Sequence, residues 1–247
     1  MKMKQSTREK VKFSIIIPAH NEEKYIDKCL DSILEAAKRC EGKVEIIVVL
    51  NRCTDKTEKI AKSYNCITIK NNDKNLSKIR NAGAKIARGE ILVTIDADTR
   101  MTPKMLDKAD KYLSSGRYIG GGVSGTFDRR SLGITVSFLS LAIPVYLKYG
   151  TKSVGIFWCY RKDFEAINGF NEKIFMGEDI DFALRLEKLG EKRNKRYGTI
   201  HFGMITSSRK FDRYGDWYLM ENPELREAYL KGTDSALAKE YYYDYKN

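Results

Sequence analysis

The chain has 247 residues, of which 42% are hydrophobic, so it is long enough to bury a full core, and we expect one large α/β domain. Lys and Arg outnumber Asp and Glu by 45 to 33, and the formal charge of +12 suits either an anionic partner (a sugar nucleotide, an acidic membrane surface or nucleic acid) or a plain basic surface. The five cysteines include no Cys-x-x-Cys pair, which argues against a disulfide framework and favours a reducing, cytoplasmic location.

Residues 13–100 alternate short apolar runs with amphipathic segments. They follow a stretch, 1–12, that is too charged for a signal peptide and that we expect to be an N-terminal tail. The expected strands are 13–18, 44–49, 66–69 and 91–95, and the expected helices are 21–37, one capped by Thr54, and 77–89. This order of strands and helices predicts a parallel sheet with right-handed crossovers.

The pattern is less regular after residue 100. We expect a helix at 103–113, a strand from Tyr118 that Gly120 to Gly122 interrupt, a strand at 154–160, a helix at 178–189 that Gly190 ends, strand and loop at 196–206, and helix from Asn222. The predicted organisation is a tail (1–12), one α/β domain (13–220, with halves 13–100 and 101–220) and a C-terminal helical tail (221–247).

Two carboxylates follow the apolar run at 91–95, at the carboxyl end of the expected strand. Open α/β sheets bind their ligands at this end. In extended geometry Asp96 and Asp98 point the same way, so both could approach one hard cation or its phosphate ligands. Thr102 and Pro103 then predict the start of a helix. The alternative is a solvated turn, because Asp-x-Asp is common in loops.

Five polar motifs follow the expected strands or begin the expected helices. They are Pro18-Ala-His-Asn-Glu-Glu23, Asn51-Arg-Cys-Thr-Asp55, Arg80-Asn81-Ala-Gly83, Asp96-Ala-Asp98 and Gly177-Glu-Asp-Ile-Asp181. In this order and spacing, over residues 13–210, they resemble the family 2 glycosyltransferases of the GT-A fold. The resemblance implies a GT-A type α/β domain with a mostly parallel sheet. It also implies an enzyme that moves a sugar from a nucleoside-diphosphate donor to an acceptor hydroxyl, usually with inversion and a divalent metal.

The resemblance also implies which residues bind the donor and its cation, Mg²⁺ or Mn²⁺. Asp98 would bind the metal, Asp96 would lie nearer the ribose and the metal's waters, and His201 is the candidate third ligand unless it is structural. The expected donor-binding residues are Pro18, Ala19, Asn21, Glu22, Asn51, Asp55, Arg80, Asp96 and Arg209.

These donor residues would meet different parts of the donor. Asn21 and Glu22 would contact the base or ribose, Arg80 would face the diphosphate, and Arg209 lies in a basic loop that would close over it. Simpler explanations are available: Asn21 and Asp55 suit helix starts, while Arg80 and Arg209 suit the surface.

Activation of an acceptor hydroxyl calls for a general base, and the acids at the start of the helix expected at 178–189 match the family's acidic pair. Asp179 is the preferred base and Glu178 the alternate. Together with Asp181 they place three acids in four positions, and such like charges raise one pKa toward working pH. An acidic first helical turn is the simpler explanation. Trp158 would stack on an acceptor sugar, or it belongs to the core.

Residues 132–147 are the most apolar window of a hydrophilic chain. As a helix they would reach about 24 Å, short of the roughly 30 Å hydrocarbon core of a bilayer, and Pro144 weakens them further, so we do not expect a membrane span. The window is either a buried core or acceptor-side helix, or a segment that meets an anionic membrane interface beside Arg129, Arg130 and Lys148. The second reading suits a lipid-linked rather than a soluble glycan acceptor, with the protein peripheral on the inner face of the membrane.

Other functions fit the sequence less well. A nucleotidyltransferase would share the sheet and a metal carboxylate, but its Gly-rich loop after the first strand has no counterpart here, and neither does the fingerprint of a Rossmann dehydrogenase. A nucleic-acid-binding protein would explain the charge but not the acidic motifs, so nucleic acid is the less favoured partner. Many relatives carry acids where this chain has Leu50-Asn51, so UDP is favoured as the donor nucleotide by family frequency alone. No motif indicates an oligomeric state.

Overall fold

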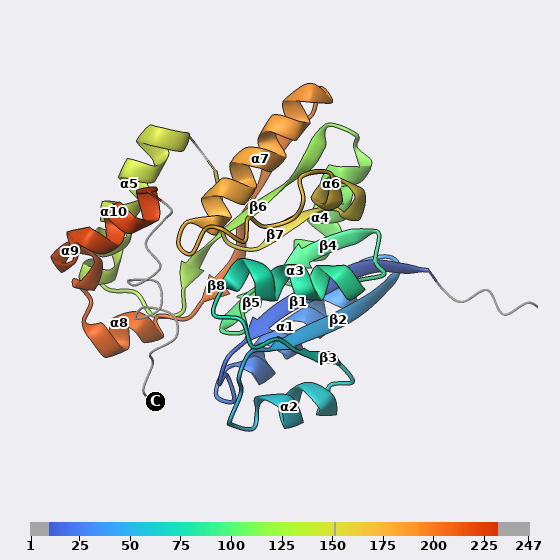
Figure 1. Cartoon of the computed structure of the whole chain (residues 1–247), viewed down its shortest axis with the longest axis horizontal. Helices are drawn as coiled ribbons and strands as arrows, with labels where there is room; N and C mark the ends of the chain where they lie inside the picture. The colour runs from blue at the N-terminus through green and yellow to red at the C-terminus, as the bar shows by residue number, and fades with distance from the viewer. Residues whose placement is uncertain (1–9, 151, 232–247) are drawn as a thin grey trace, which may run out of the picture.

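The computed structural model describes residues 10–150 and 152–231, which are arranged around an eight-stranded sheet with helices on both faces (Figure 1). The strands are β1 (Val11–Ala19), β2 (Lys43–Leu50), β3 (Ile67–Lys70), β4 (Ile91–Thr94), β5 (Thr99–Met101), β6 (Tyr118–Phe127), β7 (Phe157–Tyr160) and β8 (Arg196–Thr206). The helices are α1 (Ile26–Ala37), α2 (Thr57–Ser63), α3 (Leu76–Ile86), α4 (Met105–Ser114), α5 (Leu132–Tyr149), α6 (Arg161–Ala166), α7 (Glu178–Lys192), α8 (Arg209–Tyr214), α9 (Tyr218–Glu221) and α10 (Pro223–Lys231).

The strand order is β3-β2-β1-β4-β7-β6-β8-β5. β1 lies parallel to β2 and β4, and β2 lies parallel to β3, so the parallel half predicted from the sequence is confirmed. β7 runs antiparallel to β4 and β6, while β8 is parallel to β6 and antiparallel to β5. The predicted α/β class with a mostly parallel sheet is confirmed, and every antiparallel pair involves β5 or β7.

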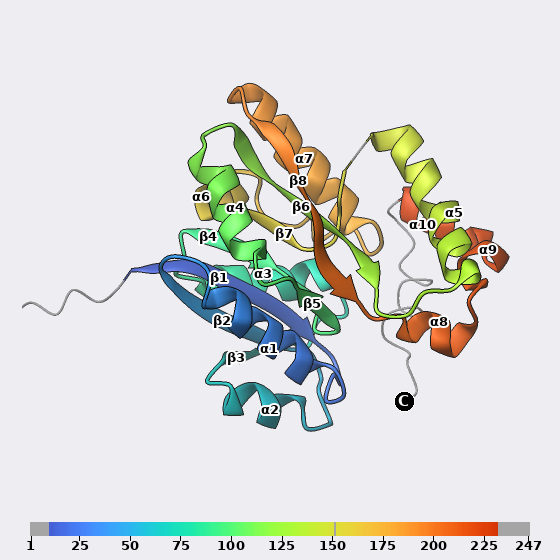
Figure 2. The same ribbon diagram turned by 180° about the vertical axis from the view of Figure 1, so that it is seen from behind.

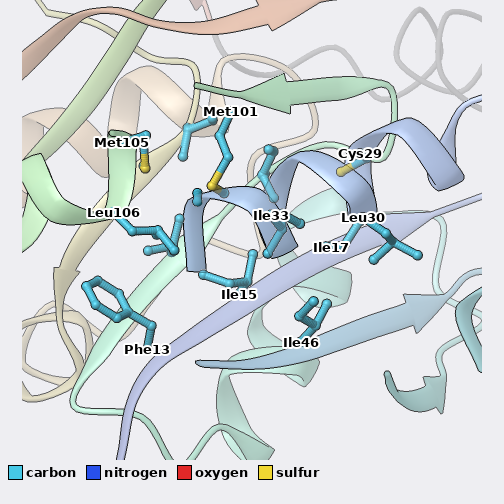
Figure 3. Packing of buried hydrophobic residues seen from close by; sticks show 14 of the residues in the cluster. Phe13, Ile15, Ile17, Cys29, Leu30, Ile33, Ile46, Met101, Met105 and Leu106 are labelled. Carbon is cyan, nitrogen blue, oxygen red and sulfur yellow. The ribbon is translucent and has the colours of Figure 1, made fainter. Parts of the chain in front are cut away.

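Successive residues of β1 enter two different apolar layers, because the side chains of a strand point alternately to opposite faces. Ile15 and Ile17 pack with α1 and α4, whereas Ile16 packs with α3 and α7. Figure 2 shows α1 and α4 on one face of the sheet, and Figure 1 shows α3 and α7 on the other. In Figure 3, Leu30 and Ile33 of α1 lie against β1. The central strands are therefore buried on both faces, which fixes the loops at their ends.

A third, smaller apolar cluster joins α5 to the C-terminal helices α8, α9 and α10. These helices gather at the end of the molecule away from β3 (Figure 1). α5 contributes Ile134 to the cluster, and Ser137 Oγ donates to the carbonyl oxygen of Asp216 at 2.7 Å. Within the described ranges α5 is the one helix long and apolar enough, by length and composition, to cross a membrane, yet only 17% of it is buried. α5 therefore packs against the protein along one side and is exposed along the other.

The prediction that Gly120 to Gly122 interrupt a strand is wrong. β6 runs through all three glycines, and their missing side chains let neighbouring backbone approach closely. A Cβ atom added to Gly121 would lie 1.9 Å from the carbonyl oxygen of Gly198, and one added to Gly122 would lie 1.9 Å from that of Ser153.

Several helix boundaries differ from the predicted ones. α1 begins at Ile26 rather than near Asn21, because Asn21 has a left-handed φ of 53° in a loop. α4 begins at Met105, after the unpredicted strand β5, which separates the acidic motif from the helix. α7 continues past Gly190 to Lys192. The sequence also fails to predict the short helices α6, α8 and α9.

The two predicted tails fall largely outside the described residues. β1 begins at Val11, within the predicted N-terminal tail (1–12), and residues 1–9 are not described. α10 belongs to the predicted C-terminal tail (221–247), of which 232–247 are not described. The domain limits inferred from the sequence therefore stay a prediction.

Replacing Gly121 by Ala should destabilise the protein, because the added methyl group meets the backbone of Gly198 at 1.9 Å and the ring of Trp158 at 2.7 Å. Overpacking of this kind costs about 3 kcal/mol, or roughly 6 to 12 °C in melting temperature for a chain of this length. Gly116→Ala is the control, since no atom lies within 4 Å of its added Cβ and only its left-handed φ of 72° opposes the change, at about 1 kcal/mol. Thermal melts that show equal losses for the two variants would contradict this explanation.

Candidate functional site

The predicted motifs converge at the edge of the sheet where the parallel strands β1, β2 and β4 end. The loops after these strands leave the sheet together, because the carboxyl ends of parallel strands coincide. α3 brings Arg80 to this edge, and the start of α7 brings Glu178. Motifs from both halves of the chain are thus assembled in one place.

The first ionic bridge of the site is made by Arg80. Its Nη2 donates to Asp96 Oδ1 at 3.0 Å, and its Nη1 donates to Glu178 Oε1 at 2.9 Å. The guanidinium lies over the ring of Phe170, 5.1 Å from the centroid, and the side chain is only 7% exposed. The alternative that Arg80 is a surface residue is therefore wrong, since it fastens the acidic motif to the start of α7.

The second ionic bridge is made by Arg209, the first residue of α8. Its Nη1 and Nη2 donate to the two carboxylate oxygens of Glu22 at 2.6 and 2.8 Å, and its Nε lies 2.9 Å from Asp98 Oδ2. Its Cζ is 4.7 Å from the centre of the Tyr25 ring, a cation–π contact. The sequence pointed to the two acids and the arginine but not to Tyr25, whose only signal is its position shortly after Glu22.

Asp96 and Asp98 lie in a tight turn rather than in the extended geometry expected from the sequence. The backbone N–H of Thr99 donates to the carbonyl of Asp96 at 3.0 Å, and the chain then enters β5. The side chain of Asp96 is 54% exposed and that of Asp98 is 16% exposed. Each carboxylate keeps a second oxygen outside its ionic bridge.

The acidic motif fits a hard cation whose coordination a bound phosphate completes. Mg²⁺ in proteins takes oxygen ligands, commonly one or two carboxylates together with substrate phosphates and water, and Mn²⁺ accepts the same donors. Asp96 and Asp98 are such donors. Within residues 10–150 and 152–231, no group of three or more His, Cys, Asp or Glu side chains could hold a metal ion. His201 is exposed on β8, and its role as a third ligand stays a prediction.

Asn21 and Asp55, two of the predicted donor residues, fasten the loops after β1 and β2 to each other. Asn21 Oδ1 accepts from the backbone N–H of Thr54 at 2.8 Å, so Asn21 does not cap α1 as the simpler explanation held. Asp55 Oδ2 accepts from the backbone N–H of Glu23 at 2.9 Å, and its Oδ1 accepts from that of Thr57 at 3.0 Å. Asp55 is thus also the helix-start carboxylate that its position before α2 suggested.

Asn51, Pro18 and Ala19, which were also predicted to bind the donor, are buried. Asn51 Nδ2 donates to the backbone carbonyls of Asn71 and Asp73, at 2.7 and 2.8 Å, and so holds the loop after β3. Pro18 and Ala19 are the last residues of β1 rather than part of the loop that follows. In this structure the three residues are part of the buried framework on which the loops after β1 and β3 rest.

The two acids at the start of α7 have different surroundings. Glu178 is buried and paired with Arg80, whereas Asp179 is half-buried. Burial raises the pKa of Glu178, against the pull of the Arg80 charge. Burial and the adjacent Glu178 charge raise the pKa of Asp179 to about 7, and Arg80 opposes them. Asp179 is therefore the carboxylate suited to accept a proton near neutral pH.

Asp181, the third acid of this motif, pairs with an arginine of its own helix, α7. Its Oδ2 accepts from Arg185 Nε at 2.7 Å, and Arg185 Nη1 donates to the carbonyl oxygens of Ile167 and Gly169. Asp181 thus orients an arginine that holds the loop after α6.

The two acids of the second bridge, Glu22 and Asp98, also have raised pKa values. Burial raises the pKa of Glu22 to about 7 in spite of the nearby Arg209, and burial likewise raises the pKa of Asp98. Buried carboxylates of this kind need a neighbouring positive charge. In this structure the guanidinium of Arg209 supplies it.

Trp158 is a core residue, so the prediction that it stacks on an acceptor sugar is wrong. Its side chain is fully buried in β7, and its ring meets the edge of Tyr112 with centroids 5.6 Å apart. Its Nε1 donates to the carbonyl oxygen of Gly122 at 3.3 Å, which satisfies the buried indole.

Matches to known proteins agree with this geometry. The profile of the family described as "Glycosyl transferase family 2" matches residues 14–187. The uncharacterized glycosyltransferase EpsJ of Bacillus subtilis (strain 168) is 28% identical over 198 residues, which are 72% of this chain and 57% of EpsJ. The poly(ribitol-phosphate) β-N-acetylglucosaminyltransferase TarS of Staphylococcus aureus (strain Mu50) is 34% identical over 111 residues, which are 42% of this chain and 19% of TarS. The chain therefore spans less than two thirds of the length of either relative.

Solved structures share the fold. TarS 1–349 of S. aureus in complex with UDP-GlcNAc aligns with a TM-score of 0.62 at 19% identity, over 81% of this chain and 59% of that one. Glucosyl-3-phosphoglycerate synthase from Mycobacterium tuberculosis, in complex with Mn²⁺, UDP and glucosyl-3-phosphoglycerate, aligns with a TM-score of 0.57 at 17% identity, over 91% of this chain and 82% of that one. Because the family profile covers well over half of the chain and the fold agrees, this chain belongs to glycosyltransferase family 2, as its motifs indicated.

Proposed function

We propose that this protein is a glycosyltransferase that moves a sugar from a nucleoside-diphosphate donor to an acceptor hydroxyl, with inversion and with a divalent cation, Mg²⁺ or Mn²⁺. The observation that carries the proposal is the Arg80 bridge. One buried guanidinium joins Asp96 of the acidic motif to Glu178, whose neighbour Asp179 has a pKa of about 7. A motif for the donor and a candidate base are thereby held in one site.

The donor half of the reaction requires positive charge, because a nucleoside diphosphate leaves as an anion. A divalent cation held by Asp98, with Asp96 beside it, would stabilise that charge on the departing diphosphate. Arg80 and Arg209 lie against the same two carboxylates, so their guanidinium groups are placed to bind phosphate oxygens as well. Glu22, in the loop after β1, is placed for the nucleoside.

The acceptor half requires a base, and we assign that role to Asp179. Its carboxylate would take the proton of the acceptor hydroxyl as the oxygen attacks the sugar carbon on the face opposite the departing diphosphate. One displacement of this kind inverts the configuration. Glu178, the alternate from the sequence, has its Oε1 engaged by Arg80 and positions that arginine instead.

UDP is the nucleotide that the relatives favour. TarS has been solved with UDP-GlcNAc and with UDP, and glucosyl-3-phosphoglycerate synthase with UDP and Mn²⁺. These ligands were bound in the structures of those two proteins. For this chain we propose a UDP-sugar, and a thermal-shift panel of UDP, GDP, dTDP and CMP sugars with and without Mn²⁺ distinguishes it from the other donors.

We further propose that α5 places the enzyme peripherally on an anionic membrane, at its inner face. A fully buried core helix does not fit, because only 17% of α5 is buried. Its exposed apolar side chains, between 44% and 76% accessible, are Leu132, Phe138, Leu139, Ile143, Tyr146 and Leu147. An exposed apolar stripe of this kind is typical of helices that lie in a membrane interface.

The ends of α5 supply the charge that an anionic surface would attract. Arg130 precedes the helix, Lys148 lies in its last turn, and both are exposed. With 18 residues α5 reaches about 27 Å, and Ser137 ties it to Asp216, so it lies along the domain rather than across a bilayer. This placement suits a lipid-linked acceptor, or a cell-surface glycan built on one.

Asp98→Asn should abolish metal-dependent donor binding and leave the fold intact, because one ligand of the cation is lost while the apolar strand before it is unchanged. With Mn²⁺ and UDP at a hundredfold excess over the dissociation constant, wild type should gain about 2.7 kcal/mol, or roughly 5 to 10 °C in melting temperature. Asp98→Asn should show no gain. Asp110→Asn is the control, since Asp110 is also paired with a cation, Lys12, but lies in α4. A full shift in Asp98→Asn would remove this residue from the metal site.

Asp179→Asn should keep its affinity for UDP and lose turnover by about 10² to 10⁴, the contribution of general-base catalysis. The base acts only when deprotonated, so kcat/KM of the wild type should rise about tenfold per pH unit until pH 7 and then level, as its pKa of about 7 requires. Asp181→Asn, two residues along and paired with Arg185, should keep its turnover within a few fold. Equal losses of UDP affinity and turnover in Asp179→Asn would make it a binding residue.

Wild-type protein should float with anionic liposomes at low salt, and Ile143→Asp/Leu147→Asp should not, because both side chains are exposed on α5. The matched control is Leu34→Asp/Ile86→Asp, which introduces the same substitutions at exposed positions of α1 and α3. This control should float as wild type does. Wild type that stays in solution with anionic vesicles would disprove the membrane contact.

A further inference from the structure

We infer that Arg209 is a built-in counterion of the acidic motif. A divalent cation must displace Arg209 from Asp98, and the displaced guanidinium then binds the diphosphate of the donor. The inference rests on the proposed function and adds to it an internal competitor for the metal. Arg209 would thereby disfavour binding of the cation alone and favour binding of the cation together with the nucleotide.

In this structure each of the three guanidinium nitrogens of Arg209 faces a carboxylate oxygen. Nη1 and Nη2 hold both oxygens of Glu22, and Nε lies 2.9 Å from Asp98 Oδ2. Asp98 is the carboxylate proposed to bind the cation, and Glu22 is the one proposed for the nucleoside. A single side chain thus engages the metal ligand and the nucleoside contact together.

A guanidinium and a divalent cation cannot share Asp98 without strong repulsion, because they would lie within a few ångströms of each other in a partly buried place. The side chains of Asp98 and Glu22 are only 16% and 10% exposed, so water screens this repulsion poorly. A diphosphate changes the balance, because its oxygens can lie between the two cations and bind both. Metal alone should therefore compete with Arg209 for Asp98. When the nucleotide is also present, Arg209 should instead strengthen binding, because it can bind the diphosphate.

Of the two arginine bridges, this is the one that can open. Arg80 is 7% exposed, lies in the middle of α3 and is covered by Phe170. Arg209 is 29% exposed, begins a six-residue helix and rests on the ring of Tyr25. Release of Arg209 requires a change of its side chain and not a loss of core packing.

The test measures Mn²⁺ binding without nucleotide, from the free-Mn²⁺ signal in electron paramagnetic resonance. Arg209→Ala should bind Mn²⁺ at least about fivefold more tightly than wild type, the lower range of coupling between sites. With Mn²⁺ saturating, the same variant should bind UDP more weakly, since a phosphate ligand is lost. Opposite signs in the two titrations are the signature of a displaceable counterion.

Two controls separate the bridge from a general loss of positive charge. Lys210→Ala removes the next charge along, whose field also acts on Asp98, and should tighten Mn²⁺ binding less than Arg209→Ala does. Arg88→Ala breaks an ion pair with the buried Glu45, near the start of β4, and should leave Mn²⁺ binding unchanged.

Arg209→Lys keeps the charge but loses the fork that spans Glu22 and Asp98, so it should also tighten Mn²⁺ binding, and it carries the test if the alanine variant does not fold. The inference is overturned if neither Arg209 variant binds Mn²⁺ more tightly than Lys210→Ala, which includes the case where none binds the metal. Failure of the proposed function looks different, since Mn²⁺ would then respond to Arg209 while UDP failed to bind to wild type.

Discussion

The site depends on one constraint: carboxylates gathered at the buried edge of a parallel sheet must each be matched by positive charge. Glu22, Asp96, Asp98 and Glu178 come from loops and helices far apart in the sequence, and two arginines pair with all four. Such pairs stabilise little by themselves, because desolvation offsets the attraction, but breaking one leaves an uncompensated buried charge. The bridges therefore act mainly as geometric ties: the Arg80 bridge joins the acidic motif to α7, and the Arg209 bridge joins it to α8.

Much of the first half of the fold follows from the sequence, because β1, β2 and β4 are buried on both faces and appear as unbroken apolar runs. The errors arise where side chains override local preference. Asn21 looks like a helix cap, but its side chain accepts from the backbone of Thr54, so the helix starts later. Gly121 looks like a strand breaker, but its neighbours need the space of a missing side chain, and only tertiary structure reveals that.

The site could be predicted as a set of residues but not as a set of pairs. The acidic motif, Arg80, Arg209 and the acids at the start of α7 were recognisable by type and spacing, whereas the partner of each depends on which loops meet. Glu22 and Arg209 are separated by 187 positions, a distance over which no local pattern can inform. Trp158 shows the converse, since a distinctive residue type at a suitable place in the sequence turned out to be buried in the core.

The segment that carries Arg209 also links the donor site to α5. Three residues along α8, Asp212 pairs with Arg129 at 2.7 Å, and Asp216 holds Arg129 at 2.6 Å and accepts from Ser137 of α5 through its carbonyl. Phe211 is buried between these contacts, so the backbone of α8 is held on both sides of this residue. Displacing Arg209 must then be mostly a swing of its side chain. Phe211 of α8 and Ile134 of α5 belong to one apolar cluster, so any force that a bound donor exerted on the α8 backbone would reach the helix whose exposed apolar side chains carry the proposed membrane contact.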